Sequence, residues 1–179
     1  DARPAAGDLR VRITVFRRNS LDELETVVWA GPYTPPPAEL YRRGVAAILS
    51  PYRVDEAAPW TTLKCGNRLP HQAARRLAEE RGVWEGLLLN TRGYLADGAI
   101  TNVFFVSDGR LRTPGGAMGA LPGIAGATVQ ELAGEMGLTV AEGTYPPEEL
   151  RRADEAFLTN ALIGVLPLVR VDGEPIGRG

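Results

Sequence analysis

One lysine, Lys64, is the residue of this chain whose type points most directly to chemistry. Of its 20 lysine and arginine residues, all except Lys64 are arginines. Because arginine supplies positive charge everywhere else, a need for charge alone does not explain this position. A lysine amine can lose its proton near neutral pH and attack a carbonyl group, whereas a guanidinium stays charged. The sequence therefore predicts carbonyl chemistry at Lys64; the alternative is a stray surface lysine.

The only cysteine and the only histidine, Cys65 and His71, lie within seven residues of Lys64. Their spacing matches no zinc pattern, and a zinc site needs three or four ligands. A cysteine nucleophile with a histidine base is also disfavoured, because we expect His71 on the polar, solvent-facing side of a helix. The cluster thus leaves the lysine as the main candidate.

Two further features complement a reactive lysine. The stretch "LPGIAG", residues 121–126, places a tight turn at the start of a helix, where free N–H groups and the helix dipole favour a phosphate. Asp97 supplies a carboxylate between two predicted strands. An amine, a phosphate-binding turn and an acid are what pyridoxal phosphate needs for its aldehyde, its phosphate and its ring nitrogen. We therefore predict pyridoxal phosphate as the cofactor.

The first elements that the sequence predicts form a hairpin. Residues 9–16 and 25–31 alternate apolar and polar side chains at the period of a strand, and the loop around residues 19–22 joins them. The proline-rich residues 31–40 are unsuited to a regular element. A domain boundary near residues 31–37 is expected, followed by a buried strand over residues 44–50.

Two helices are predicted around the candidate site. The first begins with Asn67 as its cap and Pro70 in its first turn, and it ends at Gly82. The second ends at Gly137. Its expected apolar face holds Ile124, Thr128, Leu132 and Met136.

Further strands are predicted over residues 85–90, 99–106 and 109–114, with tight turns at Arg92-Gly93 and Asp108-Gly109. Another strand, a short helix and two final strands follow, over residues 138–143, 147–152, 155–160 and 165–173. Since strands outnumber helices and most are joined by hairpins, we predict an α+β fold on a mixed or antiparallel sheet.

The composition sets limits on partners and location. The chain has 179 residues, 44% of them hydrophobic, and its net charge of −2 comes without basic runs. No face for nucleic acid is therefore expected, and no apolar run reaches the roughly 20 residues of a membrane span. One cysteine cannot form an internal disulfide. We expect a cytoplasmic protein that binds a small-molecule substrate.

From Gly44 to Gly177 the sequence resembles the class IV aminotransferase family. Four motifs carry the resemblance in the family's order: "LKCGNRL", "GYLADGAITNVFFV", "TPGGAMGALPGIAG" and "ADEAFLTNALIGVLPLVRVDG". The resemblance implies the D-amino acid aminotransferase-like fold, whose large domain is a pseudo-barrel, and a homodimer. It also implies that residues 1–36 are the end of a small N-terminal domain with its linker, and residues 37–179 the large cofactor-binding domain.

By that resemblance Lys64 is the Schiff-base lysine, Asp97 pairs with the ring nitrogen and Leu121 packs on the ring. The phosphate is held by the backbone N–H groups of Ile124 and Ala125 and by Thr159. Two departures matter. The family usually has glutamate at the position of Asp97, one methylene longer. Many members have Thr-Arg where this chain has Ala125-Gly126, which leaves more of the phosphate to backbone donors.

Within the family, "LKCGNRL" and "LTNALIGVLPLV" are most similar to aminodeoxychorismate lyases, which form 4-aminobenzoate and pyruvate for folate synthesis. The expected function is therefore that of a lyase. The alternatives are a transaminase of branched-chain or D-amino acids, and a cofactor-free relative that acts as a binding module.

Overall fold

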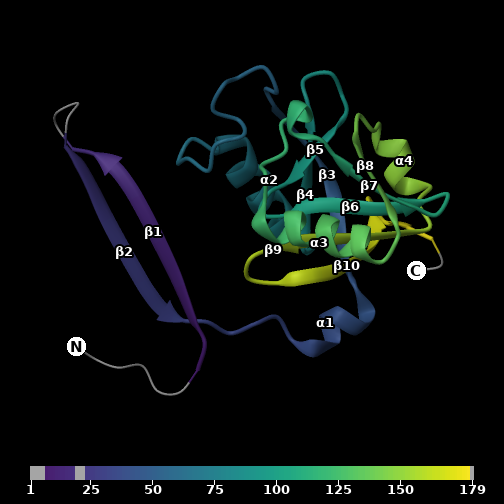
Figure 1. Ribbon diagram of the computed structural model, residues 1–179, viewed down its shortest axis with the longest axis horizontal. Helices are drawn as coiled ribbons and strands as arrows, with labels where there is room; N and C mark the ends of the chain where they lie inside the picture. The colour runs from purple at the N-terminus through teal and green to yellow at the C-terminus, as the bar shows by residue number, and fades with distance from the viewer. Residues whose placement is uncertain (1–6, 19–22, 178–179) are drawn as a thin grey trace. The chain divides into compact units, whose positions relative to one another are not determined.

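The computed structural model describes residues 7–18 and 23–177 of the chain (Figure 1). They form two compact units, Asp1–Pro36 and Pro37–Gly179. Among the described residues, no helix is long and apolar enough to cross a membrane.

The first unit is the predicted antiparallel hairpin of β1 (Leu9–Arg17) and β2 (Leu24–Pro32). Its connecting loop, predicted around residues 19–22, lies outside the described residues. Partners in register share a face, so Val11 and Ile13 lie beside Ala30 and Val28 on one apolar side. These side chains are exposed; Ile13, for example, keeps 66% of its surface.

The second unit contains a nine-stranded mixed sheet, as the fold prediction requires. Its strands follow the order β5-β4-β3-β10-β9-β6-β7-β8, with β11 also paired to β10. Their bounds are β3 (Val45–Val54), β4 (Glu85–Asn90), β5 (Leu95–Gly98), β6 (Asn102–Ser107), β7 (Arg110–Pro114), β8 (Thr139–Gly143), β9 (Glu155–Asn160), β10 (Gly164–Val171) and β11 (Glu174–Pro175).

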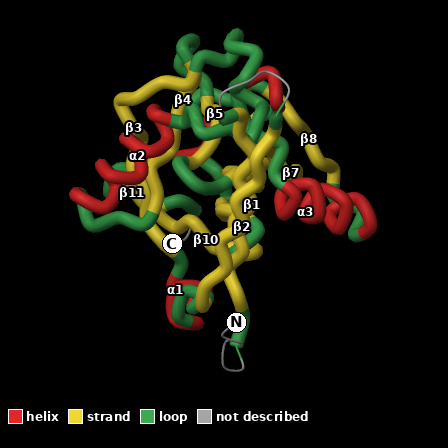
Figure 2. The backbone as a smooth tube through the Cα atoms, turned by 90° about the vertical axis from the view of Figure 1, so that its left-hand side faces the viewer, coloured by secondary structure: helices red, strands yellow, loops and turns green. Residues whose placement is uncertain are grey.

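Helices connect two of the three parallel pairs of this sheet, and the third pair is β3 with β10. α2 (Leu69–Glu80) links β3 to β4, and α3 (Ile124–Glu135) links β7 to β8. Figure 2 shows α2 beside β3 and β4 at one end of the sheet and α3 beside β8 at the other. The remaining helices are short: α1 (Ala38–Arg43), η1 (Gly116–Met118) and α4 (Pro147–Arg151).

Both faces of the central strands are buried, which explains why they read as nearly continuous apolar runs. Leu87 and Phe105 belong to the large cluster on one face of the sheet. On the other face, Leu88 packs in the cluster that includes Ala74 of α2, and Phe104 packs with Ala133 of α3.

Three details of α2 differ from the prediction. The helix begins after Arg68, and no side chain caps it, so Asn67 is not its cap. His71 was expected in solvent but is only 6% exposed, whereas Leu69 is 70% exposed. The reason is close packing: a Cβ added to Gly86 of β4 would lie 2.5 Å from the carbonyl oxygen of Ala74. A residue larger than glycine at position 86 would hold this part of the helix farther from β4.

α3 shows the same inversion. Its expected apolar face points outward, since Ile124 is 82% and Met136 is 76% exposed. Gly126 and Ala133 are the buried residues, and the Phe104 ring lies directly beneath Gly126. The predicted end of this helix is correct, because Gly137 takes a left-handed backbone with φ of 76°.

The predicted strand over residues 99–106 is shorter than expected, and an additional strand, β5, precedes it. A turn over residues 99–101 separates β5 from β6. The hairpin turn at Asp108-Gly109 is as predicted, since both residues have positive φ, 51° and 69°. Asp97 therefore lies within β5 rather than between strands.

Candidate functional site

Asp97 is the centre of the candidate site. It is only 3% exposed and sits on β5, where it pairs with Leu88 of β4. Its Oδ1 accepts hydrogen bonds from the Gly98 N–H and from Asn102 Nδ2, both at 3.1 Å. Its Oδ2 accepts a third, from the Leu121 N–H at 3.1 Å. The carboxylate is thus fixed by three donors from the β5–β6 turn and the loop before α3.

Burial raises the pKa of Asp97 to about 7. The Leu121 N–H and the Arg68 guanidinium oppose this shift, and a second buried carboxylate, Glu85, adds to it. Arg68 lies 3.8 Å from Oδ2, an ion-pair distance too long for a hydrogen bond. A cationic or hydrogen-bond-donating partner would stabilise the ionised form of Asp97 and lower this pKa again.

Asn102 joins the parts of the site. Its Nδ2 donates to Asp97 and also to the Leu121 carbonyl oxygen at 2.7 Å. Its Oδ1 occupies the space that a side chain at Gly123 would need, because an added Cβ there would lie 2.0 Å away. Glycine is therefore required where the loop enters α3, so that the helix start can lie against Asn102.

The start of α3 and Thr159 lie on either side of Asn102. Gly123 is the N-cap of the helix without a side-chain cap, so the N–H groups of Ile124 and Ala125 have no partner within the helix. Across the sheet, Asn102 pairs in register with Thr159 of β9. Thr159 is fully buried, yet its hydroxyl has no hydrogen-bond partner among the described residues.

This arrangement fits pyridoxal phosphate. An unpaired buried hydroxyl is costly, and a phosphate oxygen beside free helix N–H groups would satisfy it. The buried carboxyl group of Asp97 is the kind of acid that a pyridine ring nitrogen needs. The hydroxyl and N–H donors and the buried Asp97 carboxyl group thus match the two ends of the cofactor.

Lys64 lies on the loop between β3 and α2, where its side chain is exposed. This loop ends at Arg68, the residue whose guanidinium reaches Asp97. The structure therefore brings Asp97, Leu121, Ile124, Ala125 and Thr159 around Asn102, and attaches the lysine loop to them through Arg68.

Sequence reasoning did not single out Asn102 or Arg68. Both stand inside motifs that were recognised, "GYLADGAITNVFFV" and "LKCGNRL". A polar residue opening an otherwise apolar strand was the available signal for Asn102. For Arg68, only the fold shows that a loop residue reaches a carboxylate on β5.

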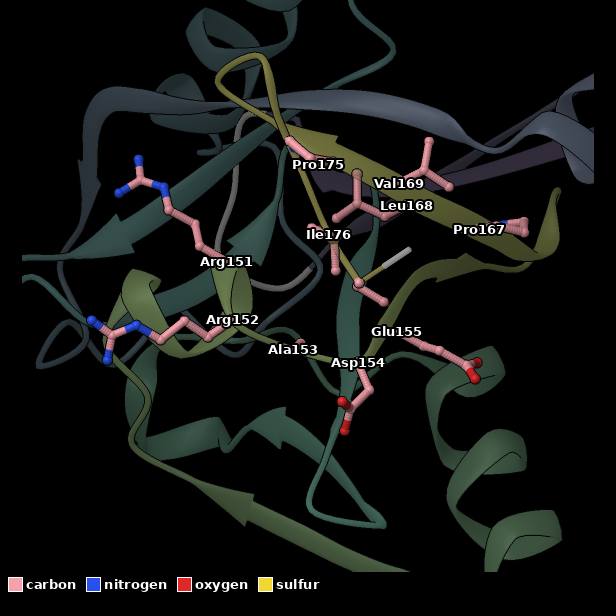
Figure 3. A pocket seen from close by; sticks show the side chains of 12 residues that line it. Arg151, Arg152, Ala153, Asp154, Glu155, Pro167, Leu168, Val169, Pro175 and Ile176 are labelled. Carbon is pink, nitrogen blue, oxygen red and sulfur yellow. The ribbon is translucent and has the colours of Figure 1, made fainter. Parts of the chain in front are cut away.

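Neither of two hollows in the second unit is lined by these predicted site residues. The larger, of about 950 Å³, lies between α4, β9 and β10. In Figure 3 its charged residues Arg151, Arg152 and Glu155 extend in different directions rather than toward one point. Without converging polar groups it is a poor candidate for a catalytic centre. The smaller hollow lies beside the lysine loop.

Solved structures share this fold. A branched-chain aminotransferase from Thermoproteus uzoniensis, crystallised with norvaline, matches 96% of this chain and 60% of its own, with 30% identity and a TM-score of 0.86. A Legionella pneumophila protein provisionally named a 4-amino-4-deoxychorismate lyase matches 89% of this chain and 59% of its own, with 25% identity and a TM-score of 0.79. The fold and site therefore define a pyridoxal-phosphate-dependent enzyme class.

The sequence comparisons identify the family within that class. The family model for class IV amino-transferases matches residues 2–171. The branched-chain-amino-acid aminotransferase of Escherichia coli K12 is 36% identical over 146 residues, which are 79% of this chain and 47% of that enzyme. This chain belongs to the class IV aminotransferase family, as the sequence predicted, and spans about half the length of the curated relatives it matches.

Proposed function

We propose that Lys64, Asp97, Leu121, Ile124, Ala125 and Thr159 hold pyridoxal phosphate in this chain. The observation that carries the proposal is the unpaired, buried hydroxyl of Thr159, whose strand pairs with Asn102, together with the uncapped start of α3, which also lies against Asn102. When bound, the cofactor supplies an electron sink for bonds at the substrate's amine-bearing carbon. The chain supplies the groups that orient it and move protons.

Asp97 has the role of keeping a proton on the ring nitrogen. Its Oδ2 accepts one hydrogen bond, from Leu121, and so retains a lone pair for a further donor. The three fixed donors stop the short side chain from rotating. This rigidity offsets the loss of one methylene relative to glutamate, since the carboxylate needs no reorganisation when a cation arrives.

Lys64 has two roles in the proposal. Its ε-amine would hold the aldehyde of the cofactor, and when free it would remove and return protons at the substrate. As the only lysine of the chain, it carries the only ε-amine that the cofactor's aldehyde could occupy. Borohydride reduction and peptide mapping should place a pyridoxyl group at Lys64 alone, and a Lys64→Ala chain should take up no reducible label. A label on any other residue would refute this assignment.

As the reaction we propose the aminodeoxychorismate lyase activity, which converts 4-amino-4-deoxychorismate to 4-aminobenzoate and pyruvate. The motifs "LKCGNRL" and "LTNALIGVLPLV" support it, and so does the fold shared with the Legionella protein. A cytoplasmic homodimer, with residues 1–36 as the end of a small N-terminal domain and residues 37–179 as the large domain, is part of the same proposal.

A transaminase of branched-chain or D-amino acids is the second candidate. The 36% identity to the E. coli branched-chain enzyme favours it. In addition, Asn160 of the lyase-like motif has a structural role: its Oδ1 accepts from the N–H groups of Leu162 and Ile163, and its Nδ2 donates to Ile100. Because Asn160 has this structural role in the turn, its presence is weaker evidence for the lyase reaction. A binding module without cofactor is the third candidate function.

The two reactions differ in their need for a keto acid. For the full-length protein supplied with 4-amino-4-deoxychorismate, the lyase proposal expects equal amounts of 4-aminobenzoate and pyruvate without 2-oxoglutarate. Turnover of leucine, valine or D-alanine that depends on 2-oxoglutarate, with no 4-aminobenzoate formed, would establish the transaminase instead. Failure to bind pyridoxal phosphate would favour the binding module. Residues 1–179 alone should be inactive in either assay if one wall of the substrate site belongs to the rest of the small domain.

A further inference from the structure

The smaller hollow lies beside the lysine loop, at the start of α2, and has a volume of about 300 Å³. Its apolar lining residues are Trp60, Leu63, Leu69 and Pro70, and its polar ones are Arg53, Asp55, Thr61, Asn67, Arg68 and His71. We call it the His71 pocket. None of the residues proposed above to hold the cofactor lines it.

His71 is the feature of this pocket that the fold does not explain. The residue is 6% exposed, and neither of its ring nitrogens has a hydrogen-bond partner among the described residues. Burial, together with the nearby Arg68 guanidinium, lowers the pKa of His71 to about 4. The ring is therefore neutral at pH 7 and presents one N–H donor and one acceptor, both unused. A buried polar group in this state is usually satisfied by water or by a ligand.

The charged groups of the pocket favour an anion. Arg53 and Arg68 each bring a guanidinium, and Asp55 brings one opposing carboxylate, so the local balance is one positive charge. Arg53 uses one donor on the Ser50 carbonyl oxygen at 3.0 Å. Arg68 stays 3.8 Å from Asp97, which leaves donors for another acceptor, since a guanidinium carries five N–H bonds. The planar fork of such donors matches a carboxylate.

We propose that the His71 pocket binds the carboxylate of a small organic acid, whose apolar body lies among Trp60, Leu63 and Leu69. Arg53 and Arg68 would pair with the carboxylate, and the His71 N–H would donate to it. The pocket volume is at the small end of the range for ligand sites, which suits an acid of about ten heavy atoms. This site stands on its own observations and does not depend on the proposed reaction.

The test uses benzoate as the probe and benzamide as its uncharged analogue of the same shape. Because His71 is the only histidine of the chain, its ring signals in NMR spectra need no further assignment. We expect benzoate to shift these signals in a saturable way and benzamide to bind at least tenfold more weakly. Unmoved signals, or equal affinity for benzamide, would overturn the proposal. Neither cofactor nor substrate is present, so the result is independent of the proposed enzyme activity.

Variants locate the carboxylate within the pocket. Arg68→Gln and, separately, Arg53→Gln should each weaken benzoate binding at least tenfold in calorimetric titrations. Arg76→Gln is the matched control. Arg76 is exposed on α2 and pairs with Glu80, so this variant should bind benzoate as tightly as the parent. Parent-like binding by both pocket variants contradicts the proposal, as does an equal loss in the control. The second arginine keeps the test decisive if one variant does not fold.

Discussion

Asp97 and Thr159 are both buried at the candidate site, but they differ in hydrogen bonding. Asp97 accepts three hydrogen bonds from Gly98, Asn102 and Leu121, whereas the Thr159 hydroxyl has no partner among the described residues. The chain therefore builds the acid end of the site completely in advance. At the other end it leaves a polar group whose desolvation, of about 1–3 kcal/mol, only a bound group would offset.

The comparison is tested most severely by Asp97→Asn in the full-length protein. An amide cannot hold a proton on a ring nitrogen as a carboxylate does, so we expect turnover to fall about 100-fold or more while the cofactor stays bound. Steady-state kinetics and the cofactor's absorbance measure the two effects. Asp108→Asn is the control at an exposed turn and should keep parent-like turnover. Unchanged turnover of Asp97→Asn would show that the Asp97 carboxyl group has no catalytic role.

Asn102→Ala should remove the link between the two ends of the site. The substitution deletes hydrogen bonds to Asp97 and to the Leu121 carbonyl oxygen, so we expect the free energy of unfolding to fall by about 2–3 kcal/mol. Denaturant-induced unfolding measures it. The matched change Asn67→Ala concerns an exposed residue whose side chain caps no helix and should cost less than about 0.5 kcal/mol. Equal effects of the two variants would contradict the role given to Asn102.

The pKa of Asp97 predicts how stability depends on pH. Its folded pKa of about 7 lies above the ordinary value of 3.8, so the folded chain holds this proton more tightly than the unfolded chain. The contribution is present below pH 4 and is lost as the pH rises through 7. We expect the parent chain to lose about 1–3 kcal/mol relative to Asp97→Asn between pH 4 and 8. Parallel stability curves for the two chains would show that burial does not hold the proton.

Thr159→Val should have the smallest effect on stability. Since the hydroxyl has no partner, replacing it by a methyl group of the same shape should change the free energy of unfolding by less than about 1 kcal/mol. The affinity for pyridoxal phosphate should nevertheless fall about tenfold, as for the loss of one hydrogen bond to a charged group. Thr113→Val provides the contrast, because this buried hydroxyl donates to the Val103 carbonyl oxygen at 2.9 Å and its loss should be destabilising. If Thr159→Val lost as much stability as Thr113→Val, the Thr159 hydroxyl would have a hydrogen-bond partner in the folded chain.

The sequence was sufficient for most strands, though not for β5, and for the C-terminal end of α3, because these depend on local periodicity and on glycines such as Gly137. It was misleading for the orientation of both helices. Large apolar side chains were expected to face the sheet, but α2 and α3 pack through Ala74, Gly126 and Ala133. Large apolar residues such as Leu69 and Ile124 stay exposed. Close approach to Gly86 and Phe104 decides this. Such a constraint acts between elements and has no local pattern.

The candidate site was predictable in its residue types but not in its connections. Local sequence patterns pointed to Asp97 and to the start of α3, and the resemblance to the family implied Thr159. The bonds of Asn102 join residues that are 5 and 19 positions apart, and the Arg68 contact spans 29 positions, so pairwise patterns did not indicate them. The missing partner of Thr159 is likewise a property of the packed sheet, because a threonine in a strand ordinarily finds one.

The position of β3 in the sheet has a consequence for the order of folding. β3 is the first strand of the second unit to be synthesised, but one of its neighbours, β10, is among the last: Ala46 pairs with Arg170. The ribosome must therefore release nearly the whole chain before the middle of the sheet can close. Strands β3 to β5 and strands β6 to β9 can each pair earlier, because their partners are nearer in sequence. Until β10 is available, the edges of β3 and β9 that it joins stay unpaired. During that interval the nascent chain is most prone to aggregate through these edges, so chaperone binding would help it most.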